Sequence, residues 1–262
     1  IASTFGMMLG VSALITVLSV MNGFSAELHQ RLLSVTPHLL LTPESSLSVD
    51  LDSLSEAALE IEGVIAASAY HSGRALLRSH ERYNGARLTG ATGKGLRDVI
   101  RLDGKIIQGD LDKLELIPFS IVLGSGLATA LGVVPGDLVE AVLPRLTVSP
   151  LGIFPRSKML TVVAVFEVGA QPDISEAFVS MDTASRLFRS IGSVGVQVRL
   201  RDRDHAPVLS RNIVELNSVA VQIKDWTASK GSLFTAIRME KITVSLLLLS
   251  IVLVAAFNLI QL

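Results

Sequence analysis

The chain contains no cysteine among its 262 residues. This excludes disulfide bonds and removes the usual ligands of structural zinc. The five histidines, at positions 29, 38, 71, 80 and 205, show no metal-ligand spacing such as an i,i+4 pair on one helix. We therefore expect no metal site in this chain.

Charge is also scarce, at 18% of residues, and the mean hydropathy of +0.53 is high for a soluble domain. All charged residues lie between Glu27 and Lys241, which leaves uncharged blocks at residues 1–26 and 242–262. A membrane-spanning helix needs about 20 mostly apolar residues. A cleaved signal peptide is the alternative for the first block, but that block lacks a basic beginning and a cleavage motif. The pattern favours two membrane helices with a large head between them.

Charge does not reveal the side on which the head lies, because the positive-inside rule fails for long translocated segments. The formal net charge is −1, and the sequence contains no basic patch interleaved with aromatic residues. Such a patch is the usual mark of a nucleic-acid interface. We therefore expect no nucleic acid among the partners of this chain.

The sequence of the head predicts a mixture of helices and strands. Turn residues and apolar alternation predict strands over 38–42, 64–70, 73–79, 86–92, 121–123, 138–143, 160–168, 175–180, 195–200 and 219–223. Helices are predicted over 51–61, 125–131, 181–189, 206–215 and 226–241, with Gly63 and Gly132 as C-terminal caps and 83–85 as a hairpin connection. The order of these elements is typical of an α+β fold.

Two glycine-rich segments resemble catalytic motifs but fail their patterns. The segment 90–95 lacks the first glycine and the Ser or Thr of a phosphate-binding loop. The segment 123–127 lacks both outer glycines of a nucleophile elbow. We therefore expect the chain not to be an enzyme.

The segment 144–155 is unusual because it combines three prolines with five apolar side chains. Prolines cannot donate ladder hydrogen bonds, so we expect an irregular loop here. A loop that exposes apolar side chains commonly binds a partner. The alternative is that these side chains are buried against their own domain.

Several motifs resemble the LolC and LolE family, the transmembrane subunits of the lipoprotein-releasing ABC transporter of Gram-negative bacteria. The resemblance begins at Ser19-Val-Met-Asn-Gly-Phe24 and Thr36-Pro37-His38 and continues at Leu131-Gly-Val-Val-Pro-Gly-Asp137. It includes Trp226, Lys230-Gly231, Leu233-Phe234 and Met239-Glu240-Lys241. It covers essentially the whole chain.

The resemblance implies an α+β periplasmic head between two transmembrane helices. The head would consist of a porter-like βαββαβ subdomain and an inserted, mainly β Sabre-like subdomain. The implied divisions are 1–36 and 226–262 for the membrane helices with their stalks, 37–95 and 181–225 for the porter-like part, and 96–180 for the Sabre-like part. The implied location is the cell inner membrane, as a multi-pass protein with a large periplasmic domain.

The resemblance also implies the functional residues. Within the unusual loop of residues 144–158, the hook that recruits the periplasmic carrier LolA would comprise Ser149, Pro150, Leu151, Gly152, Ile153, Phe154 and Pro155. An adjoining pad would contain Arg145 and Lys158, while Glu140 stands where we expect another basic pad residue. Cavity and helix-packing positions would be Gly6, Gly10, Met21, Asn22, Phe24, Phe234 and Met239.

The implied partners are LolA, a LolD-type ATPase, a second LolC- or LolE-type subunit, lipoprotein substrates and membrane lipids. No cofactor is expected in this chain, since ATP and Mg²⁺ would bind to the ATPase. Two other functions are compatible with the same architecture. One is a regulator of periplasmic hydrolases, similar to FtsX, and the other is a MacB-type efflux subunit.

Overall fold

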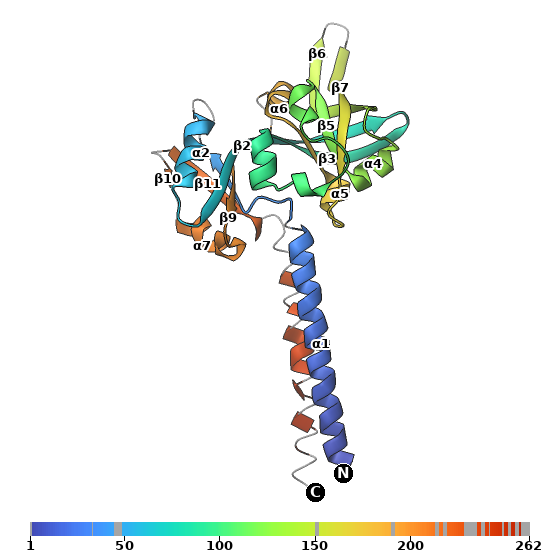
Figure 1. Ribbon diagram of the computed structural model, residues 1–262, viewed down its shortest axis with the longest axis vertical. Coiled ribbons are helices and arrows are strands. Elements are labelled where there is room, and N and C mark those ends of the chain that lie inside the picture. Colours follow the sequence, from blue (N-terminus) through green and yellow to red (C-terminus); the bar gives the residue numbers. More distant parts are fainter. Residues whose placement is uncertain are drawn as a thin grey trace. The chain divides into compact units, whose positions relative to one another are not determined.

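The computed structural model describes residues 2–32, 34–44, 49–149, 152–189, 192–212, 215–216, 219–227, 235–236, 239–240, 242–247, 249–250, 253–254 and 257. The chain divides into two compact units. One unit contains residues 1–30 and 227–262, and the other contains residues 31–226, here called the head. Figure 1 shows both units.

The first unit is helical. Helix α1 (Ala2–Leu32) covers the first uncharged block and continues into the charged residues that follow it. The described residues between 235 and 257 are also helical. Within the described ranges, no helix combines the length and the apolar character that crossing a membrane requires.

The first layer of the head is a four-stranded antiparallel sheet with two helices. Its elements follow one another as β1 (Leu39–Pro43), α2 (Leu51–Leu59), β2 (Val64–Ser79), β9 (Ser193–Leu200), α7 (Ala206–Asn212) and β11 (Val219–Asp225). The strands lie in the order β11-β1-β9-β2, the split βαβ arrangement. A two-residue strand, β10 (Glu215–Leu216), extends it beside β11, and a 3-10 turn, η3 (Arg203–His205), precedes α7.

The second layer is a ring of six strands, formed by β2 and five strands that lie between β2 and β9 in the sequence. Its strands are β2, β3 (Arg82–Ala91), β8 (Glu176–Ser180), β5 (Ser120–Gly124), β7 (Gly152–Phe166) and β6 (Leu138–Ser149), and β6 pairs back onto β2. Closing the ring gives each strand a partner on both sides within the ring. Its interior is filled by apolar side chains such as Leu77, Leu88, Ile121 and Val162, all at most 1% exposed.

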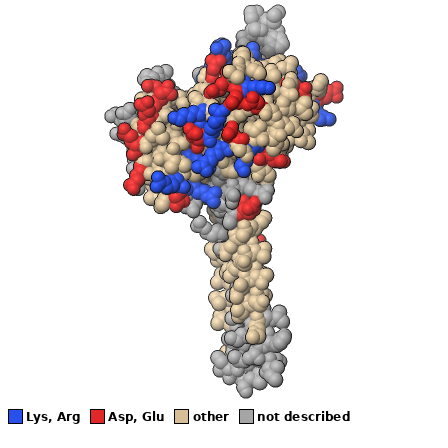
Figure 2. Space-filling model, viewed as in Figure 1, with Lys and Arg blue, Asp and Glu red and all other residues tan. Residues whose placement is uncertain are grey.

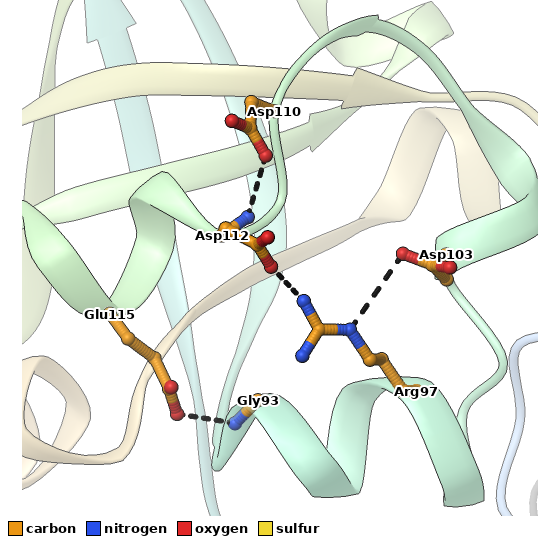
Figure 3. Close-up of polar contacts among 6 residues, drawn as sticks. All are labelled: Gly93, Arg97, Asp103, Asp110, Asp112 and Glu115. Carbon is orange, nitrogen blue, oxygen red and sulfur yellow. Dashed lines mark hydrogen bonds and ion pairs between the residues drawn. The ribbon is translucent and has the colours of Figure 1, made fainter.

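A segment of short elements covers the outside of the ring. It comprises η1 (Gly95–Val99), η2 (Asp103–Lys105), β4 (Ile106–Gly109) and α3 (Lys113–Leu116), and it buries a second apolar cluster around Leu96, Leu114 and Phe166. Figure 3 shows polar contacts of this segment: Arg97 pairs with Asp112 and Asp103 within the segment, and Glu115 accepts from the amide of Gly93 at 2.6 Å. The shared apolar cluster is what packs the covering segment against the ring.

The remaining helices support the ring. They are α4 (Ser125–Leu131), α5 (Pro172–Ser175) and α6 (Met181–Phe188). Gly132 caps α4 with a left-handed φ of 67°, which confirms both the helix bounds and the cap predicted from the sequence. The α+β class of the head is also confirmed. The division into porter-like and Sabre-like parts stays a prediction, since residues 31–226 form one compact unit.

The prediction of two strands at 64–70 and 73–79 was wrong, because β2 is one strand of 16 residues. Gly73 suggested a break in the strand, but its role is to make room for the aromatic ring of Phe188. A Cβ atom built at Gly73 would lie 2.5 Å from Cε1 of Phe188. The glycine therefore permits close packing of α6 on an unbroken strand.

Three turn predictions also need correction. The connection between β2 and β3 is at His80-Glu81, with His80 at φ 52°, and not at residues 83–85, which are paired within β3. Helix α2 ends at Leu59 with Glu60 as its cap, so Gly63 lies beyond it. Helix α7 ends at Asn212, three residues before the predicted end, and Glu215 belongs to β10.

The glycine-rich segment 90–95 has a packing explanation. Added Cβ atoms would lie 2.1 Å from Cβ of Ala184 at Gly90, 2.9 Å from the Glu115 carboxyl group at Gly93, and 2.3 Å from the Ser68 hydroxyl at Gly95. Each glycine therefore allows a close approach of another element, which the sequence did not predict.

Candidate functional site

The segment 144–155 was predicted as an irregular loop, but its described residues, 144–149 and 152–155, form the distal half of a β-hairpin. Strand β6 continues to Ser149 and β7 begins at Gly152, with Leu146 opposite Pro155 and Ser149 opposite Gly152. Pro144 is accommodated because the register shifts between Val142 and Leu146. Beyond this shift the described pairing involves only β6 and β7, and Figure 1 shows the hairpin extending past the ring.

The described backbone places the predicted hook residues around the end of this hairpin. Ser149, Gly152, Ile153, Phe154 and Pro155 lie on its two strands. Pro150 and Leu151 lie outside the described residues. Only the backbone is described for residues 145–149 and 152–155, so the orientation of these hook side chains and of Arg145 stays a prediction.

The pad residues lie on opposite faces of the hairpin. Glu140 is directly opposite Met159, whereas Lys158 is opposite Ala141. Because side chains alternate between faces along a strand, Glu140 and Lys158 point away from each other. The sequence pattern did not separate these two surfaces.

On the first face, the negative charge of Glu140 is balanced by a neighbouring cation. The guanidinium of Arg78, directly across from Glu140 on β2, forms an ion pair with it. A hydrogen bond from the Ser157 hydroxyl and the pairing with Arg78 both hold the pKa of Glu140 below its usual value. The acidic residue at this position is therefore compensated by Arg78.

On the second face, Lys158 lies at a pocket that the sequence did not predict. Its Nζ atom lies 4.1 Å above the centre of the Phe119 ring, and the Arg186 guanidinium lies 5.9 Å from the same point. Arg156 donates to the backbone carbonyl of Arg186 at 2.8 Å. The pocket is lined by Phe119, Arg156, Ser157, Lys158, Ser185, Arg186, Leu187 and Arg189.

The positive charge of this pocket is local. Figure 2 shows acidic and basic side chains intermixed over the visible face of the head. The lining residues of the pocket, by contrast, contain four cations and no carboxylate. The pattern that could have revealed it is the i,i+2 spacing of Arg156 and Lys158 on a strand and the i,i+3 spacing of Arg186 and Arg189.

The predicted cavity residues belong to the helical unit. Gly6, Gly10, Met21, Asn22 and Phe24 lie on α1. Phe24 and Met239 are 62% and 60% exposed, and a Cβ atom at Gly10 would meet nothing within 4 Å. Phe234 lies outside the described residues. Their role in a cavity stays a prediction.

Known proteins resemble this chain over most of its length. The sequence profile of the family described as MacB-like periplasmic core domain matches residues 1–216. The lipoprotein-releasing system transmembrane protein LolC of Neisseria meningitidis serogroup B is 36% identical over 99% of this chain and 63% of its own length. The LolE protein of Haemophilus influenzae, from the same named system, is 25% identical over 99% of this chain and 64% of its own length. The chain thus spans less than two thirds of these relatives.

Among solved structures, the periplasmic region of MacB from Actinobacillus actinomycetemcomitans matches with a TM-score of 0.45 and 14% identity. That match covers 76% of this chain and 93% of the MacB chain.

Proposed function

The chain belongs to the MacB-like periplasmic core domain family, and from this premise we propose that it is part of a membrane subunit of a lipoprotein-releasing ABC transporter. The subunit takes lipoproteins from the inner membrane and passes them to a periplasmic carrier of the LolA type. The observation that carries this proposal is the 36% identity to a LolC protein along nearly the whole chain. The head is periplasmic, and the partner subunit is of the LolC or LolE type.

The β6–β7 hairpin recruits the carrier through its tip. A two-stranded hairpin supported by a closed ring of strands presents its end residues with little loss of conformational freedom on binding. The rings of Pro150 and Pro155 fix their own φ angles and so restrict the backbone further. Leu151 and Phe154 supply the apolar contacts, which makes the tip a small binding hot spot.

The uncharged blocks 1–26 and 242–262 anchor the head in the membrane as two helices. An acyl chain leaves the bilayer only when its methylene groups, at about 0.8 kcal/mol each, stay out of water. The cavity residues on these helices, together with Phe234 and Met239 just before the second block, provide the apolar entry to that path. Energy comes from ATP and Mg²⁺ bound to a separate LolD-type ATPase, so this chain needs no catalytic residue of its own.

Replacing Leu151 by Asp tests the hook directly. We expect at least a tenfold loss of carrier binding, because a carboxylate at the tip must be desolvated against an apolar partner. Site-specific crosslinking between the full chain and purified LolA-type carrier measures the effect.

The matched control is Leu116→Asp, since Leu116 is 77% exposed and lies on α3, outside the hairpin. It should leave crosslinking intact. Equal crosslinking by Leu151→Asp and the parent chain would reject the hook. In a separate pull-down with the full chain, recovery of a cell-wall hydrolase in place of the carrier would favour the FtsX-like alternative.

A further inference from the structure

Three arginines from separate parts of the sequence gather at one place on the head. Arg101 lies between η1 and η2, Arg199 is on β9, and Arg203 begins η3. The guanidinium of Arg199 donates a hydrogen bond to the backbone carbonyl of Val99, two residues before Arg101. The backbone carbonyl of Arg203 accepts from Nε1 of Trp226 at 3.1 Å. These contacts bring the covering segment, β9 and η3 together.

The two chain segments that connect the head to the helical unit also meet here. Trp226 is the last residue of the head, and its backbone amide donates to the carbonyl of His38 at 3.1 Å. The amide of His38 donates in turn to the carbonyl of Val198 at 2.9 Å, next to Arg199 on β9. The arginines therefore lie beside the points at which the chain enters and leaves the head.

The charge of Arg199 is buried without a carboxylate to balance it. Arg199 is 9% exposed, and burial, followed by the charges of Arg101 and Arg203, lowers its pKa to about 10. A neighbouring carboxylate would raise this pKa, and none among the described residues does so. An unbalanced buried charge is costly, and an anionic ligand would reduce that cost.

The backbone on either side of Arg101 is held by hydrogen bonds. Arg101 has a left-handed φ of 57°, which is uncommon for a residue other than glycine. The amide of Ile100 donates to the carbonyl of Gly95 at 3.1 Å, and that of Leu102 donates to the carbonyl of Leu96 at 2.9 Å. The exposed Arg101 side chain therefore extends from a fixed backbone position.

We propose that Arg101, Arg199 and Arg203 form a binding site for a phosphate group. Each guanidinium offers planar, paired N–H donors, and the oxygens of one phosphate can accept from several such groups at once. A carboxylate has only two oxygens, which a single guanidinium can satisfy. The site contains none of the residues assigned to the hook or the pad.

The phosphate group can belong to an anionic phospholipid or to a molecule in solution. The phospholipid source rests on the proposed function, which places the uncharged blocks in the bilayer. Anionic headgroups attract clustered arginines at a membrane surface, and here they would hold the head by the two segments that lead to the membrane. Binding of phosphate from solution does not depend on the proposed function.

The only tryptophan of the chain, Trp226, provides a signal for binding. It is 8% exposed and is bonded to Arg203, so a ligand at the arginines should change its fluorescence. The full chain in dodecyl maltoside is titrated with inorganic phosphate, or with phosphatidylglycerol in mixed micelles of the same detergent. Acetate is the carboxylate reference. We expect a saturable change with at least one of the two phosphate probes and a much weaker response to acetate.

Arg101→Gln removes one guanidinium from the exposed part of the site. We expect it to weaken binding about tenfold, because it removes charge-assisted hydrogen bonds to the phosphate. Arg199→Lys keeps the buried charge but loses the paired donors, and it should also weaken binding. The matched control is Arg74→Gln on β2, an exposed arginine whose loss changes the net charge equally and should leave the affinity unchanged.

Thermal unfolding gives a second measurement that does not depend on fluorescence. A ligand that binds only the folded chain raises the midpoint of unfolding. We expect the effective probe to raise this midpoint equally in the parent chain and in Arg74→Gln, and clearly less in Arg101→Gln.

The outcomes separate the sources and the proposals. A response to phosphatidylglycerol alone identifies a lipid headgroup as the ligand, and a response to inorganic phosphate supports a site that also accepts phosphate from solution. If neither probe acts in either measurement, or if Arg101→Gln binds as tightly as Arg74→Gln, the phosphate site is wrong. Acetate binding as tight as that of phosphate would overturn it in favour of a carboxylate site. Failure of the hook in the Leu151→Asp test would leave binding of inorganic phosphate unaffected, so the two proposals can fail separately.

Discussion

At the scale of single residues, His38 shows how the head handles a buried titratable group. It is 5% exposed and follows Pro37 directly. Its Nδ1 atom accepts a hydrogen bond from the amide of Leu200 at 3.1 Å, so the ring is neutral with its proton on Nε2. Burial, followed by the charges of Arg199, Arg203 and Arg101, lowers the pKa of His38 to about 4.

This pKa predicts a pH dependence of stability. Above pH 6.5 the histidine is neutral in both folded and unfolded chains, and the head keeps its full stability. As the pH falls from 6.5 to 4, His38 becomes protonated in the unfolded chain but stays mostly neutral in the folded head. The free energy of unfolding should therefore decrease by about 2–3 kcal/mol in this window.

Denaturant unfolding of the parent chain and of His38→Gln at pH 7 and pH 4.5 measures this effect. The stability difference between the two chains should shrink or reverse at the lower pH, because glutamine accepts a hydrogen bond without titrating. His205→Gln is the control, since His205 is exposed. A constant difference between parent and His38→Gln would show that folding does not change the pKa of His38.

At the scale of elements, β2 connects the two layers of the head. Residues 64–72 pair with β9 in the four-stranded sheet, and residues 70–79 pair with β3 in the ring. Three residues near its end, 76–78, also pair with β6, the first strand of the hairpin. The hairpin is thus hydrogen-bonded to a strand that begins in the other layer.

The continuity of β2 depends on the fit between Gly73 and Phe188. Gly73→Ala should lower the free energy of unfolding by about 1–3 kcal/mol, because the added methyl group overlaps the ring. Phe188→Leu in the same chain should recover part of this loss, as expected for residues in contact. Thermal or denaturant unfolding of the four chains measures the coupling.

Gly85→Ala is the matched control on the neighbouring strand β3. A Cβ atom there meets nothing within 4 Å, so we expect a change smaller than about 0.5 kcal/mol. Equal losses of stability at Gly73 and Gly85 would mean that backbone entropy, and not contact with the Phe188 ring, causes the effect of Gly73→Ala.

At the scale of the whole molecule, the proposal places the head in the periplasm and the two uncharged blocks in the bilayer. Because the chain has no cysteine, a single introduced thiol reports its own surroundings without background. Ser193 is exposed on the head, and Ser250 lies in the second uncharged block. A thiol introduced at each position in turn reports whether that position lies in water or in lipid.

We expect a thiol reagent that cannot cross the inner membrane to label Ser193→Cys in cells with a permeabilised outer membrane. Ser250→Cys should react slowly even after lysis, because thiolate formation is suppressed in lipid. Labelling of Ser193→Cys only after lysis would place the head in the cytoplasm. Rapid labelling of Ser250→Cys would contradict a membrane helix at 242–262.

The sequence by itself determined the features that depend on neighbouring residues. Alternation, capping glycines and turn residues located α4 with its cap at Gly132 and most strands, because these signals act within a few residues. The segregation of charge marked the two end blocks for the same reason. The motifs shared with LolC and LolE identified the family without any knowledge of the fold.

Only the tertiary structure decided the features that depend on distant partners. Gly73 is indistinguishable from a turn glycine until Phe188, more than a hundred residues later, is placed against it. The closure of the ring requires β6 to pair with β2, and the cationic pocket requires α6 to meet β7 beside Phe119. Such contacts follow from the packing of the whole chain, and a single sequence carries no local pattern for them.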